Sequence, residues 1–203
     1  MQGGFVQISG GMGSSDAVGT SGGTGGDFFL NGGEAKGLGS NNRGGNIQLT
    51  GGSAVQGTGG AIQVATGFSS IKDSGEITFS TANSGISGIS GFIALQTGSS
   101  SYGTSGAITA QTGDAIRGAG GNIIMSVGAG NSGVGGKIEL QAGRTTALSG
   151  TGGKSGGIVT VTTGYSSSSS GDMFLKTANS GKSGVSGSMY LTSGTAATGK
   201  DIH

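Results

Sequence analysis

The chain has 203 residues, of which 51 are glycine, and glycine, serine and threonine together make up about half of it. Charged residues account for 9%, the formal net charge is +1, and proline, cysteine and tryptophan are absent. This composition excludes a disulfide scaffold and a thiolate zinc site, and it provides no field to attract nucleic acid. No apolar run approaches the roughly 20 residues of a membrane span, and residues 1–4 do not resemble a signal peptide.

A repeat of about fifteen residues organises the whole sequence. Each unit starts at a glycine, and apolar residues stand two and four positions after it. The units start at Gly4, Gly26, Gly45, Gly60, Gly75, Gly91, Gly106, Gly121, Gly136, Gly157, Gly171 and Gly187, with a thirteenth at Lys200.

The apolar pairs predict short strands with one buried face, because one residue separates the two members of each pair. We expect an all-β fold, a parallel β-solenoid of about 13 coils with about 15 residues per coil. The predicted core ladder consists of Ile47, Leu49, Ile62, Val64, Ile77, Phe79, Ile93, Leu95, Ile108, Ile123, Met125, Ile138, Leu140, Val159, Val161, Met173, Leu175, Met189 and Leu191.

The second half of each unit is rich in small residues and glycine. A small row that faces the apolar ladder predicts a flattened cross-section, and unit-ending glycines predict tight corners, since glycine allows positive φ and close backbone approach. The predicted corners include Gly60, Gly75, Gly91, Gly106, Gly121, Gly136, Gly171 and Gly187.

A bundle of polyproline II helices is the alternative fold. Glycine recurs at every third residue in places, as in residues 85–91, and this spacing suits packed polyproline II helices.

A longer repeat lies above the short one. Residues 81–91 recur as residues 177–187, an offset of 96 residues or six units. We expect one domain over residues 1–203, and we interpret it as a piece of a longer array or as a unit whose open ends stack.

The charged residues predict no catalytic site. The carboxylates are scattered without a fixed offset, whereas general acid–base catalysis needs two positioned groups. The single histidine, His203, is the last residue. Residues 22–29 fit one copy of a calcium β-roll motif, which makes Asp27 a weak calcium candidate; a glycine corner followed by an outward aspartate is the simpler interpretation. We therefore expect no enzyme activity, no cofactor and no metal.

A flat polar strand face has two further uses. Ice binding relies on paired Thr-x-Thr rows, and only Thr160 and Thr162 form such a pair here. Exposed aromatic residues could stack on sugars, which makes surface glycans an alternative partner. The aromatic candidates are Phe29, Phe68, Tyr102, Tyr165, Phe174 and Tyr190.

The pattern in residues 91–106 resembles the Gly/Ser/Thr-rich β-solenoid repeat arrays of very large secreted and surface proteins of diatoms and other microalgae. Similar tracts occur in fibre proteins of large viruses and phages. This resemblance implies a structural role at a cell or virion surface, or outside the cell. We expect a building block of a filament or adhesive strand that associates with itself by end-to-end stacking of coils.

Overall fold

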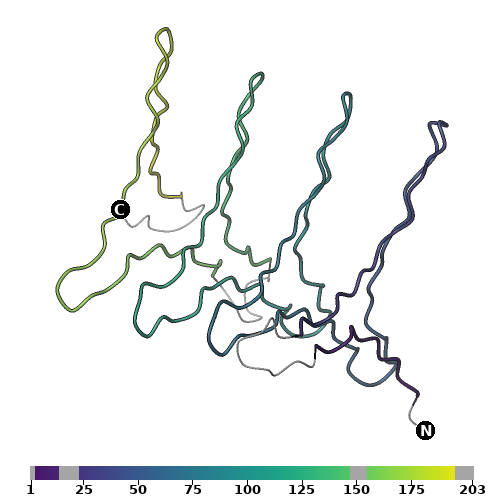
Figure 1. Cartoon of the computed structure of the whole chain (residues 1–203). Coiled ribbons are helices and arrows are strands. Elements are labelled where there is room, and N and C mark those ends of the chain that lie inside the picture. Colours follow the sequence, from purple (N-terminus) through teal and green to yellow (C-terminus); the bar gives the residue numbers. More distant parts are fainter. Residues whose placement is uncertain (1–2, 14–22, 147–154, 195–203) are drawn as a thin grey trace. The chain divides into compact units, whose positions relative to one another are not determined.

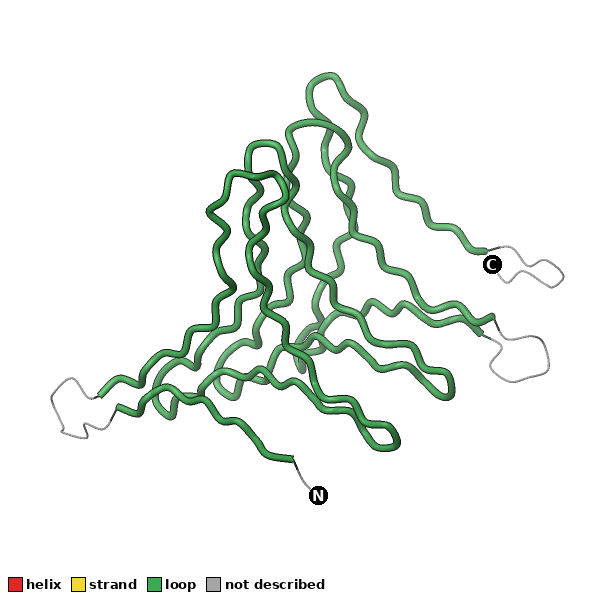
Figure 2. Tube along the Cα trace, turned by 90° about the vertical axis from the view of Figure 1, so that its right-hand side faces the viewer, coloured by secondary structure: helices red, strands yellow, loops and turns green. Residues whose placement is uncertain are grey.

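The computed structural model describes residues 3–13, 23–146 and 155–194, and within these ranges the chain forms no α-helix and no β-strand. Figure 2 accordingly draws this part of the chain as loop. The residues gather into two compact units, Met1–Ile108 and Thr109–His203. None of the described residues forms a helix that is long and apolar enough to cross a membrane.

Within each unit the chain runs out and back in narrow loops whose two legs lie side by side (Figure 1). Two loop tips are tight turns closed by a backbone hydrogen bond: Gly88 N–H donates to Gly85 C=O over 3.3 Å, and Gly184 N–H donates to Gly181 C=O over 3.2 Å. These two turns are 96 residues apart. The long sequence repeat therefore recurs as the same local structure in both units.

The predicted β-solenoid is wrong. A solenoid needs each strand to pair with the equivalent strand of the next coil, but the backbone hydrogen bonds of the described residues close individual loops and none joins one apolar stretch to another. The physical reason lies in the small half of the unit. Glycine, serine and threonine offer little apolar area to cover a ladder, and glycine loses more backbone entropy on ordering than any other residue.

The polyproline II bundle does not describe the structure either. The glycines spaced by three residues lie in the loop that turns at Gly85 and Gly88, and the hydrogen bond between those two residues is absent from a polyproline II helix. End-to-end stacking of coils also loses its basis, because the described residues form no coil face.

The predicted core ladder is not a core, since no described residue is buried. Its members are nevertheless graded in exposure. The residues two positions after each starting glycine, from Ile47 to Met189, are 48% to 61% exposed, and those four positions after it, from Leu49 to Leu191, are 63% to 82% exposed. Apolar residues at loop tips, such as Ile86, are fully exposed. The first row of the ladder is therefore the most shielded apolar surface, although nothing in the chain covers it completely.

The apolar stretches keep an extended, alternating arrangement without pairing. Gln48 Nε2 donates to Thr50 Oγ1 over 3.3 Å, and Lys137 Nζ forms an ion pair with Glu139. Each pair is separated by two positions, so both side chains lie on the same side of the chain, while the apolar residues between them lie on the other.

Hydrogen exchange tests this description. In dilute, single-chain protein the amides of Gly60, Gly75 and Gly171, which donate to loop carbonyls, should exchange about fivefold more slowly than their neighbours, for a bond worth about 1 kcal/mol. Amides of residues 61–65 should exchange at the rate of an unstructured peptide, as measured by NMR. Strong protection along residues 61–65 would contradict the absence of strand pairing.

Candidate functional site

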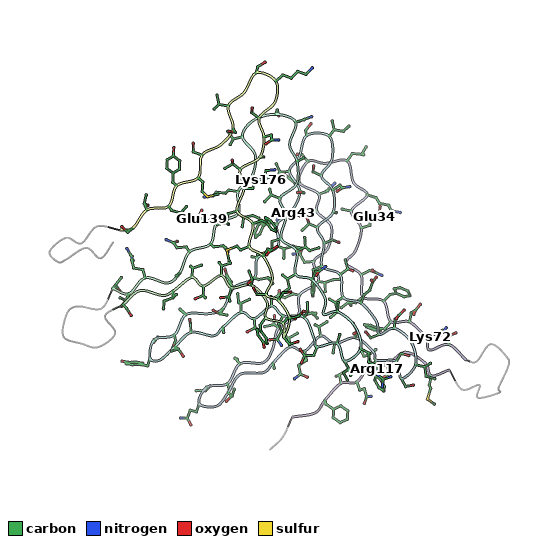
Figure 3. All side chains as sticks on the ribbon, turned by 90° about the vertical axis from the view of Figure 1, so that its left-hand side faces the viewer. Glu34, Arg43, Lys72, Arg117, Glu139 and Lys176 are labelled. Carbon is green, nitrogen blue, oxygen red and sulfur yellow. The ribbon has the colours of Figure 1, made fainter. Side chains whose placement is uncertain are left out.

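The described residues contain no conventional binding site. No pocket is present, and no group of three or more histidine, aspartate or glutamate side chains in residues 3–13, 23–146 and 155–194 could hold a metal ion. Figure 3 shows the labelled charged side chains on separate stretches of the chain, among them Glu34, Lys72, Arg117 and Lys176.

Asp27 is exposed, and among the described residues it belongs to no group of three or more histidine, aspartate or glutamate side chains that could hold a metal ion. The ion pairs do not build a site either. Lys36 Nζ lies 3.6 Å from a Glu34 carboxylate oxygen, with both side chains more than three-quarters exposed. Exposed pairs of this kind contribute about 0–1 kcal/mol to stability.

The recurrent structural feature is a neck that closes each loop. At every neck the starting glycine of one unit meets the residue that stands six positions after the starting glycine of the preceding unit; we call this residue the closing residue. The necks pair Gly10 with Gly26, Gly32 with Gly45, Gly51 with Gly60, Thr66 with Gly75, Thr81 with Gly91, Thr97 with Gly106, Thr112 with Gly121, Val127 with Gly136, Ala142 with Gly157, Thr163 with Gly171 and Thr177 with Gly187.

The glycines predicted as solenoid corners therefore lie at the necks of loops. Positive φ is not what these positions require, because the described residues adopt it only at Gly103, with a φ of 98°, and at Gly133, with a φ of 75°. Both stand a few residues before a starting glycine. The starting glycines are instead needed for close approach of two backbones.

One type of neck is held by backbone contact. Gly60 N–H donates to Gly52 C=O over 2.8 Å, and a Cβ on Gly51 would overlap the Gly60 carbonyl oxygen. Equivalent bonds run from Gly26 to Gly11 and from Gly45 to Gly33, where the closing residue is again glycine. Gly171 forms the same bond to Gly164, although its closing residue is Thr163. Only glycine fits the closing position at necks as narrow as that of Gly51.

A second type of neck is lined by a β-branched side chain. A Cβ on Gly121 would lie 3.4 Å from the Thr112 methyl carbon, and at Gly91 the Thr81 hydroxyl donates to the glycine carbonyl over 3.2 Å. The necks are also the most enclosed places in the described chain. Five described residues are less than 36% exposed, and four of them are closing residues, namely Gly51, Ala142, Thr163 and Thr177.

Sequence reasoning missed the closing residue, although a signal for it exists. Position six of every unit holds a small or β-branched residue, and none carries a charge. The predicted inward row of small residues has another role: Ser69 Oγ accepts the Lys72 N–H over 2.9 Å, and Ser100 Oγ donates to the Tyr102 C=O over 2.9 Å. These hydroxyls satisfy loop backbone groups and do not face a core.

Between two necks lies a seven-residue stretch that runs from a starting glycine to the closing residue, and we call it the apolar segment. The segments that contain the predicted core ladder begin with residues 45–51 and 60–66 and continue through residues 171–177 to 187–193. Each segment presents two apolar side chains on one side. The two ends of each segment lie at necks, and its apolar side chains are exposed. The apolar segment is therefore the repeated exposed apolar surface of the described chain.

Comparison of the chain with protein-family models, with curated proteins and with solved structures gives no match.

Substitution at a neck tests its structure. Gly51→Ala should open the loop at residues 52–60, because the new Cβ would overlap the Gly60 carbonyl. Loss of a hydrogen bond worth about 1 kcal/mol should raise the exchange rate of the Gly60 amide about fivefold. Gly52→Ala is the matched control, since a Cβ there would meet nothing within 4 Å. Equal exchange rates in the two variants would contradict the close approach at this neck.

Calcium titration tests the Asp27 interpretation. Because Asp27 belongs to no group of three or more candidate metal ligands among the described residues, millimolar calcium should leave the circular dichroism spectrum and the calorimetric baseline unchanged. Asp27→Asn should behave in the same way as the natural chain. A saturable heat that disappears in Asp27→Asn would show that the aspartate does bind calcium.

Proposed function

We propose that this chain is a structural protein, a building block of an extracellular filament or of an adhesive strand at a cell or virion surface, which associates with itself. The observation that carries the proposal is the exposed, regularly repeated apolar ladder. The resemblance of residues 91–106 to the arrays of large secreted and surface proteins supports the location.

The large accessible surface of the chain supports this proposal. Its accessible surface is 20,729 Å² for 19.1 kDa. A compact globular protein of this mass exposes about 8,400 Å². A chain that leaves well over twice that surface in water, in an ordered pattern, is suited to an assembly and poorly suited to work alone.

The low net charge, and the lack of a sheet and of a pocket in the described residues, favour self-association over ice binding and glycan binding. With a net charge of +1, copies repel one another weakly. Ice binding needs a flat sheet face, and the described residues form no sheet. The six aromatic candidates for sugar stacking are exposed, but no pocket gathers them, so glycans remain the secondary partner.

Electron microscopy over a concentration series tests the proposed function. Negatively stained protein should form uniform filaments whose length increases with concentration. Assembly should strengthen on warming from 5 to about 30 °C and change little between low and physiological salt, because apolar burial drives it and little charge opposes it. Isolated particles of constant size at every concentration would contradict a filament-forming role.

A further inference from the structure

We propose that copies of this chain associate side by side, parallel and in register, through their apolar segments, and that each chain is enclosed along its length by more than one other copy. This inference rests on the proposed function and specifies the contact that assembles the structure. The occupant of the ladder is thus the same segment of another copy.

The first argument is the unsatisfied backbone. Folded proteins form about one internal hydrogen bond per residue. Among the described residues the backbone–backbone bonds lie at necks and loop tips, so the interiors of the segments, such as residues 61–66, have extended backbone with no intrachain backbone partner. Extended backbone of this kind is a template for pairing with another chain. An apolar ligand alone would cover the side chains and leave these groups unpaired.

The second argument is the area. To reach the surface of a compact protein, the chain must bury about 12,000 Å², whereas a standard interface covers about 800 Å² on each partner. A single flat contact would be far too small. Contact between chain ends would cover only the terminal segments and leave interior ones, such as 75–81 and 91–97, exposed. Enclosure by neighbours along the whole length meets the requirement.

The third argument concerns register. All segments have seven residues, but the loops between them differ in length: residues 33–45 form a longer loop than residues 52–60. A shift by one unit would set long loops beside short ones and expose one segment at each end. The in-register arrangement buries every segment and makes all copies equivalent.

A pair of substitutions separates the ladder from the rest of the apolar surface. Ile93→Asp places a charge in the first row, where the side chain is 56% exposed, and should raise the dissociation constant at least tenfold in sedimentation equilibrium. Ile89→Asp, four residues away on a loop where the side chain is 97% exposed, should leave the constant within twofold of the natural value. The single chain has no core to disrupt, so Ile93→Asp reports on association.

Spin labelling tests orientation and register, and the absence of natural cysteine allows single labels. Nitroxides on Gln48→Cys and on Thr160→Cys, both on the outward side of apolar segments, should each show dipolar broadening within assemblies of one labelled variant. Broadening only in mixtures of the two variants would show an antiparallel arrangement and overturn the proposal. Absence of broadening in all samples would indicate contact between ends and would also overturn it.

The outcomes also separate this inference from the proposed function. A discrete oligomer with in-register labels but no filaments would support the inference and contradict the filament role. Filaments that form equally well with Ile93→Asp would support the filament role and overturn the inference. A chain that stays monomeric at millimolar concentration would contradict both.

Discussion

Close backbone approach at the necks is the constraint on which the rest of this structure depends. Where Gly51 faces Gly60, the two main chains come so near that any side chain would collide. At such necks the approach of the two main chains holds the end of one apolar segment next to the start of the following one. Because each neck joins residues close in sequence, it forms at a low cost in loop-closure entropy. Local order at the necks therefore does not depend on the burial of apolar surface.

The apolar segments stay exposed although their ends lie at necks. Ile77 and its equivalents are the most shielded members of the ladder, yet about half of each side chain still faces water. In an ordinary domain a second layer of structure would cover such a row. Here the residues that would form that layer are glycine, serine and threonine in loops, where Ser69 and Ser100 bond to loop backbone. The described residues therefore form a single layer in which the apolar row stays exposed.

The sequence predicted the repeat and the alternation of side chains but not the way in which units connect. The starting glycines from Gly26 onward all lie at necks, and Gln48 and Thr50 share a side of the chain as the two-residue period requires. The solenoid was wrong because periodicity reveals which residues are equivalent and not which of them touch. Thr97 and Thr112 could have been recognised by their invariant position within the unit. Their contact with a glycine that follows the loop could not, since it depends on the chain doubling back.

The two kinds of neck have a consequence for how such an array can change. Each apolar segment runs six positions from its starting glycine to its closing residue, whereas the loop that a neck closes varies in length. The loops at residues 33–45 and 164–171 differ in length and close through the same backbone bond. Insertions, deletions and foreign peptides can therefore enter between the two sides of a neck without altering the spacing of the apolar segments. The molecule is in this respect a display scaffold: the loops can vary in sequence and length while the apolar segments keep their spacing.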